Sequence, residues 1–138
     1  MSDYVPSPVA VAAMRRLVAS VAGTGPILEE HVNDNDEVLP HLLIADLRRW
    51  FVDAVVAGNA RGVTDFLAAI EVLYASEDPD TRNVMEVSFM EDLLALPDAN
   101  EQAAIEVLQL RAGPRTREGL IATYTYLHPP GDEARPAS

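Results

Sequence analysis

Apolar residues recur at helical spacing along most of this chain. Between residues 8 and 22 they occupy positions 10, 14, 17, 18 and 21, which is the i, i+4, i+7, i+8, i+11 pattern of one helical face. Similar periodic segments, separated by Gly, Pro, Asn and Asp, follow it along the sequence. They predict a short helix at residues 27–32 and longer helices at about 38–57, 60–76 and 78–96, then one from residue 98 to the Gly113-Pro114 break and a last one at 115–127.

Strict alternation of apolar and polar positions, which is typical of strands, is not convincing in any segment. At residues 121–127, "IATYTYL", the β-branched and aromatic residues leave a strand possible. We therefore expect an all-α protein of five main helices plus a short one, arranged as a single-domain antiparallel helical bundle or array of five to six helices. The domain should cover residues 1–127, and the tail at residues 128–138 should be disordered.

Two helix starts carry recognisable cap signals. Asp78 precedes Pro79, which is the pattern of an N-cap residue followed by proline at the first helical position. Asp98 stands three residues before Glu101, a variant of the capping box. Both signals predict where a helix begins.

The composition fits a globular domain. With 138 residues, 49% of them hydrophobic, the chain can bury roughly two-thirds of the surface that its unfolded form exposes. Cysteine is absent, which excludes disulfides, thiolate metal sites and thiol catalysis. No run of about eighteen apolar residues is present, and Arg15 and Arg16 interrupt the N-terminal apolar run. We therefore expect no membrane span, no signal peptide and a cytoplasmic location.

The charge of the chain is strongly negative and unevenly distributed. The formal net charge is -12, and every Lys or Arg position is an arginine. Residues 65–106 hold eleven acidic residues against one arginine, Arg82. Nucleic-acid binding depends on many Lys and Arg contacts with phosphates, so this composition argues against a nucleic-acid partner. It favours a basic protein partner, because complementary charge speeds encounter and sharpens partner choice.

The stretch "EDPDTRNVMEVSFMEDLL" at residues 77–94 is rich in carboxylates. On an α-helical wheel Glu86 falls amid apolar residues, whereas Glu91 and Asp92 fall elsewhere, so these acids do not form one cluster. We interpret Glu86 as a boundary residue that pairs with an arginine or reaches solvent, because a buried carboxylate without a partner is costly. Glu71, at the edge of the preceding apolar arc, has the same interpretation. A functional carboxylate remains the alternative at both positions.

Recognised catalytic motifs are absent from the sequence. The chain has three histidines, His31, His41 and His128. They stand in neither H-E-x-x-H nor paired E-x-x-H motifs, so zinc-peptidase and di-iron sites lack their ligands. No phosphate-binding glycine loop and no G-x-S-x-G motif is present. We expect no enzyme activity, no cofactor and no metal, with a metal-dependent enzyme that uses Glu71, Glu86 and Glu91 as the alternative.

One small basic patch surrounds the Gly113-Pro114 break. Arg111, Arg115 and Arg117 flank it, and together with the amides of the new helix they could hold an anion. The favoured interpretation is internal, since these arginines can offset the acidic helices.

Four segments resemble an uncharacterised bacterial family of small acidic all-helical proteins. They are "LPHLLIADLRRWF" (39–51), "DFLAAIEVLY" (65–74), "VSFMEDLL" (87–94) and "GPRTREGL" (113–120). The resemblance covers about residues 37–125 and carries over no catalytic residue. Some members of this family resemble immunity proteins that are encoded beside secreted polymorphic toxins.

The resemblance and the charge distribution together suggest an acidic inhibitor, similar to an immunity protein, that neutralises a basic toxin such as a nuclease by direct binding. The alternative is an acidic chaperone or adaptor for another basic protein. The expected partner-binding residues are acids in loops and at helix starts, where carboxylates are exposed. They are Asp34, Asp36, Glu37, Glu77, Asp78 and Asp80.

Overall fold

The computed structural model describes residues 5–129, and residues 1–4 and 130–138 lie outside the description. The predicted disordered tail at residues 128–138 therefore falls almost wholly outside it. Every regular element of the described part is helical, which confirms the predicted all-α class. The elements are α1 (Pro8–Ser20), α2 (Gly25–Asn35), α3 (Pro40–Ala57), α4 (Ala60–Tyr74), α5 (Pro79–Asn83), η1 (Val84–Glu91), α6 (Asp92–Ala95), α7 (Ala99–Arg111) and α8 (Pro114–Leu127).

The helix count differs from the expected five to six. Because α5, η1 and α6 follow one another without a break, they form one rod, and the described residues then contain seven helices. The expected total was too low, because the helical segments predicted one by one from the sequence already number seven and correspond to these seven helices. The extended backbone of Ala112 and Gly113 separates α7 from α8 at the predicted Gly113-Pro114 break. The segment at 121–127 lies inside α8, so the strand alternative is wrong.

Local side chains and backbone conformation set several helix ends. Asp78 accepts a hydrogen bond from the Thr81 amide at 2.9 Å and caps α5. Asp98 accepts from the Glu101 amide at 2.8 Å, while the Glu101 carboxylate accepts from the Asp98 amide at 3.0 Å, which completes a capping box at α7. Gly58 ends α3 in a left-handed conformation with φ 72°. The caps predicted at Asp78 and Asp98 are confirmed.

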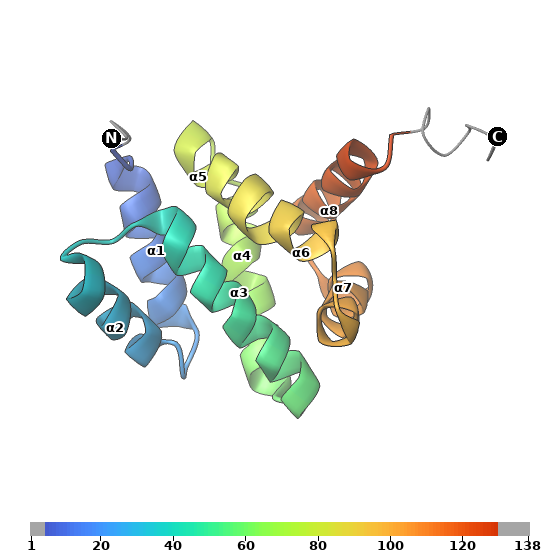
Figure 1. Ribbon diagram of the computed structural model, residues 1–138, viewed down its shortest axis with the longest axis horizontal. Coiled ribbons are helices and arrows are strands. Elements are labelled where there is room, and N and C mark those ends of the chain that lie inside the picture. Colours follow the sequence, from blue (N-terminus) through green and yellow to red (C-terminus); the bar gives the residue numbers. More distant parts are fainter. Residues whose placement is uncertain (1–4, 130–138) are drawn as a thin grey trace.

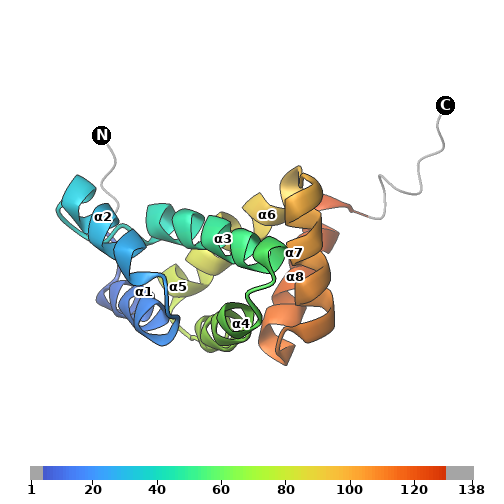
Figure 2. The ribbon, with the colours of Figure 1, turned by 90° about the horizontal axis from the view of Figure 1, so that it is seen from below.

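The helices are arranged around α3. Figures 1 and 2 show α3 in the middle of the molecule, with α1 and α2 toward one end and α7 and α8 toward the other. The rod of α5, η1 and α6 packs against α3 and also contacts α8. No helix among residues 5–129 is both long and apolar enough to cross a membrane. The single-domain antiparallel bundle stays a prediction.

All three phenylalanines of the chain meet in the core. Phe51 from α3, Phe66 from α4 and Phe89 from η1 are fully buried. The ring centroids of Phe51 and Phe66 lie 4.7 Å apart, and those of Phe66 and Phe89 lie 5.9 Å apart. Burial and ring contacts of this kind hold the rod onto α3 and α4.

The middle of the rod, η1, is a π-helix, and this corrects the expected position of Glu86. A π-helix turns by roughly 80° per residue rather than about 100°, because its hydrogen bonds join residues i and i+5. At that spacing one arc holds five buried residues, Val84, Met85, Ser88, Phe89 and Met90. The opposite arc holds Glu86, Val87 and Glu91, of which the first two are exposed and the third is partly buried. An α-helix would instead put Glu86 on the same face as Met90.

Hydrogen bonds from residues of α3 and α4 stabilise η1 in this conformation. The Arg48 guanidinium donates to the Ser88 carbonyl, and the Ser88 hydroxyl lies 2.6 Å from Nδ1 of His41. From the other side, the Tyr74 hydroxyl donates to the Met85 carbonyl at 3.1 Å. The hydrogen-bond partners of these backbone and side-chain groups of η1 therefore lie outside η1 itself.

Candidate functional site

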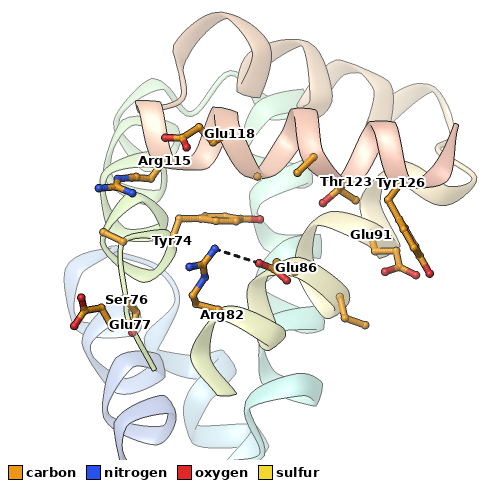
Figure 3. A pocket seen from close by; sticks show the side chains of 14 residues that line it. Tyr74, Ser76, Glu77, Arg82, Glu86, Glu91, Arg115, Glu118, Thr123 and Tyr126 are labelled. Atoms are coloured by element: carbon orange, nitrogen blue, oxygen red, sulfur yellow. Dashed lines mark ion pairs between the residues drawn. The ribbon is translucent and has the colours of Figure 1, made fainter. Parts of the chain in front are cut away.

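An open cleft of about 760 Å³ lies beside the π-helix. Its walls are the end of α4 with the loop that follows, the α5 and η1 part of the rod, and α8 (Figure 3). The charged and aromatic residues that line it are Tyr74, Glu77, Arg82, Glu86, Glu91, Arg115, Glu118 and Tyr126. We call this hollow the acidic cleft, because its lining holds four glutamates and two arginines.

The carboxylates of the acidic cleft are not fully neutralised by its arginines. Arg82 forms an ion pair with Glu86 at 3.5 Å, and both side chains are about half exposed. This pairing confirms the interpretation of Glu86 as a boundary residue. Among the described residues of the lining, three glutamates, Glu77, Glu91 and Glu118, then remain against one arginine, Arg115. The cleft therefore attracts positive charge.

Tyr74 forms a rigid inner surface of the cleft. Its hydroxyl is held by the Met85 carbonyl, and Figure 3 shows its ring between Arg82 and α8. Burial, and secondarily the negative charge of Glu86, raises the pKa of Tyr74 far above its usual value, so the phenol stays neutral. Gly119 allows α8 to pass close to this ring, because a Cβ atom there would lie 2.5 Å from Cε1 of Tyr74.

Glu71 lies outside the acidic cleft and caps α8. One carboxylate oxygen accepts from the amide and the hydroxyl of Thr116, at 2.9 and 2.8 Å, and the other accepts from the Arg115 amide at 2.9 Å. Partial burial alone would raise the pKa of Glu71, but these hydrogen bonds and the Arg115 charge outweigh it and lower the pKa. The start of α8, which was considered as a site for an external anion, therefore binds a carboxylate of the chain itself.

Asp78 and Asp80 are engaged in contacts between α1 and α5. The Ser7 hydroxyl donates to Asp78 at 2.9 Å, and the Ser7 amide donates to Asp80 at 2.8 Å. Hydrogen bonds from the hydroxyl and the amide of Thr81, with a smaller contribution from Ser7, lower the pKa of Asp78 against a weaker opposing effect of burial. Both side chains are therefore partly buried, and not exposed as expected for helix-start acids, because Ser7 comes from a segment about seventy positions earlier in the chain. Their role in binding a partner stays a prediction.

The other predicted partner residues are divided between two places. Glu77 lines the acidic cleft. Asp34 lines a separate groove of about 700 Å³ between α2 and α3, while Asp36 ends α2 with φ 61° and Glu37 is exposed in the loop that follows. The structure therefore brings Glu77, and none of the other five predicted acids, into the acidic cleft.

Sequence reasoning did not place Glu118 and Tyr126 in a site. Both lie on α8, and no local pattern shows that this face of α8 meets the rod. Glu91 was considered together with Glu71 and Glu86 as a possible metal set. Among residues 5–129, no group of three or more His, Cys, Asp or Glu side chains could hold a metal ion, and Glu71 faces the start of α8 instead.

The fold and the cleft define a small, acidic, all-α protein with an open, negatively charged hollow. The chain belongs to a family described as a domain of unknown function (DUF7674), which matches residues 14–117. The match includes Glu71 and the start of α8, while Glu118 and Tyr126 lie beyond it. No curated protein and no solved structure shows a significant match to the chain.

Proposed function

We propose that this protein is an acidic inhibitor of immunity-protein type, which neutralises a basic toxin by direct binding and has no catalytic role. The observation that carries the proposal is the acidic cleft, whose carboxylates come from three separate parts of the fold. Glu77 follows α4, Glu86 and Glu91 belong to η1, and Glu118 belongs to α8. A basic side chain that enters the cleft meets carboxylates from several directions.

The cleft suits a partner's arginine or lysine for two physical reasons. Its charge attracts cations over a distance of about 10 Å at moderate salt, which raises association rates. Its inner surface is held before any partner arrives, since Tyr74 is bonded to η1 and Arg82 is paired with Glu86. A prearranged site loses less conformational entropy on binding than a flexible one.

The proposal first predicts a genetic and cellular result. If the protein is an inhibitor of this type, a flanking gene should encode a basic protein that arrests the growth of cells producing it. Co-production of the present protein should restore growth, and the two purified proteins should form a complex. Failure of both flanking gene products to bind would contradict the proposal.

The position of the charges is tested with two variants of equal net charge. The first carries Glu77→Gln, Glu91→Gln and Glu118→Gln inside the acidic cleft. The matched control carries Glu29→Gln, Asp53→Asn and Glu106→Gln, which are exposed elsewhere. We expect the cleft variant to associate with the basic partner about tenfold more slowly at low salt, with a weaker salt dependence of the rate. The association rate of the control variant should change by less than about twofold. Equal effects of the two variants would mean that net charge alone matters.

The alternative function is distinguished by the activity of the bound partner. An immunity-type inhibitor abolishes the partner's toxic activity in the complex. An acidic chaperone or adaptor binds the same basic surface but leaves the released or delivered partner active. An activity assay of the purified complex, before and after dissociation at high salt, separates the two.

A further inference from the structure

A second groove lies on the opposite side of α8 from the acidic cleft. It has a volume of about 500 Å³ and is formed by the end of α6, the loop that follows, α7 and α8. The residues of α8 and its C-cap that line it follow the i, i+3, i+4, i+7, i+8, i+11 pattern of one helical face, from Arg117 at one end to the C-cap residue His128 at the other. We call it the α8 groove.

The lining of the α8 groove differs sharply from the rest of this acidic protein. Among residues 5–129, no aspartate or glutamate lines it. Its walls are largely apolar, and they include Leu94, Ile105, Leu120, Ile121 and Tyr124. Ile121 is 65% exposed and Tyr124 is 51% exposed, so the apolar surface is open to a ligand.

Arg117 supplies positive charge at the end of the groove nearest the start of α8. Its Nε donates to the Ala112 carbonyl at 3.0 Å, which fixes the direction of the side chain. Among the described residues no carboxylate lies within 4.0 Å of its guanidinium, although Arg48, Arg49, Arg61 and Arg82 all have such partners. A guanidinium held in this way can form a bidentate contact with an incoming carboxylate.

His128 lines the other end of the groove. Its Nδ1 lies 3.1 Å from the Tyr124 carbonyl, and its ring stacks on that of Tyr124 with centroids 4.3 Å apart. The groove is therefore a short apolar channel along about three turns of α8, with a cation at one end and a stacked aromatic pair at the other. Its volume lies within the range of small-molecule sites, roughly 300–1,000 Å³.

We propose that the α8 groove binds a small amphiphilic carboxylate. The carboxylate pairs with Arg117, and the apolar body lies along Ile121 and Tyr124 toward His128. Charge complementarity selects this occupant, because an anion is repelled by most of the surface of a protein with net charge -12 but here meets a guanidinium and, within the described part of the chain, no acid. The proposal does not depend on the acidic cleft or on a protein partner.

The test compares three ligands that share one apolar chain and differ in the head group: decanoate, decanol and decyltrimethylammonium. The two ions are used below their micelle concentrations and decanol below its solubility limit. Binding to the intact protein is measured by calorimetry and by amide chemical shifts. We expect decanoate to bind at one equivalent, with shifts confined to α7, α8 and the end of α6, and decyltrimethylammonium to bind this groove at least tenfold more weakly. A simple apolar patch on an acidic protein predicts the reverse order.

Three variants locate the site. Arg117→Gln should weaken decanoate binding about tenfold and remove the preference over decanol. Ile121→Glu, at an exposed position, should abolish decanoate binding without unfolding the protein. Arg115→Gln is the matched control, because Arg115 belongs to the same helix but lines the acidic cleft, and its decanoate affinity should be unchanged.

Three results would overturn the proposal. The first is equal or tighter binding of decyltrimethylammonium in the α8 groove. The second is an Arg117→Gln variant that binds decanoate as well as the parent does while its circular dichroism and melting temperature are normal. The third is concentration-dependent dimerisation through this face that decanoate does not disrupt, which would make the groove an interface between two copies of the chain.

Discussion

Replacing Glu71 by glutamine tests whether the carboxylate of α4 holds the start of α8. The change keeps the size of the side chain and one acceptor oxygen, which can still face Thr116. The other oxygen is replaced by an NH₂ group that faces the Arg115 amide. Both groups are donors, so the hydrogen bond from the Arg115 amide is lost. The negative charge at the positive end of α8 is also lost.

The expected cost follows from these contacts. A hydrogen bond to a charged group contributes about 1.5–3 kcal/mol, and the helix-terminus charge about 0.3–1 kcal/mol. Because Glu71 is partly exposed, solvent screening reduces both contributions. We expect Glu71→Gln to lower the free energy of unfolding by about 1–2 kcal/mol at pH 7, which corresponds to a melting temperature roughly 3–8 °C lower.

The pH dependence gives the sharper test. The hydrogen bonds that Glu71 accepts hold its folded-state pKa below the ordinary value, so its stabilisation is present above the unfolded-state pKa of about 4.3 and is lost as the pH falls through the lowered folded value. Protonated Glu71 resembles glutamine. The difference in unfolding free energy between parent and variant should therefore stay constant from about pH 8 to 5.5 and shrink below about pH 4.5.

Urea denaturation at a series of pH values measures this difference. Taking the difference cancels the titration of all the other carboxylates, which both proteins share. Glu106→Gln, on the exposed face of α7, is the control and should change stability by less than about 0.5 kcal/mol. A Glu71→Gln variant as stable as the parent at pH 7, or a deficit that persists unchanged at pH 3.5, would refute the capping role.

Three further predictions concern packing, capping and metals. Gly119→Ala should destabilise the protein by about 1–3 kcal/mol, although alanine favours helices, because its Cβ would meet the fixed ring of Tyr74. The control Gly25→Ala, whose Cβ would meet nothing within 4 Å, should leave the melting temperature unchanged. Ser7→Ala should cost about 1 kcal/mol or more in urea denaturation, since Ser7 caps α1 and also donates to α5; an unchanged midpoint would contradict this. Millimolar magnesium, manganese, calcium or zinc should give no saturable rise in melting temperature. A rise that saturates at one equivalent and is lost in Glu86→Gln would instead support the metal-enzyme alternative.

The elements that the sequence predicted well are those whose causes are local. The caps at Asp78 and Asp98 depend on residues three positions away, and both are present as expected. Helical periodicity likewise predicted helices at about residues 38–57 and 60–76, which correspond to α3 and α4 with their buried Phe51 and Phe66. Such signals can be read from a short window because the interacting groups lie within it.

The features that escaped prediction depend on residues distant in the chain. The π-helix places Glu86 outward, but the contacts that fasten it come from Tyr74, eleven residues before Met85, and from Arg48, forty residues before Ser88. The sequence favoured an internal role for the basic patch at the start of α8 and could not show that Glu71 is the carboxylate that binds there. The sequence also named Glu77 as a partner-binding residue. It gave no sign of the α8 side of the acidic cleft, because that side forms where α8 packs against the rod.

The π-helix also restricts how the length of this chain can vary. Over the eight residues of η1, a turn of roughly 80° instead of about 100° per residue accumulates a lag of roughly 160°, nearly half a revolution. Leu93 and Leu94 are buried in α6, which follows η1 directly, so the rotation accumulated over η1 sets the direction in which α6 presents them. Deletion of one residue within η1 would rotate α6 and carry its leucines toward solvent. We therefore expect members of this family to tolerate substitutions within η1 but to keep the number of residues between the Asp78 cap and Leu93 constant.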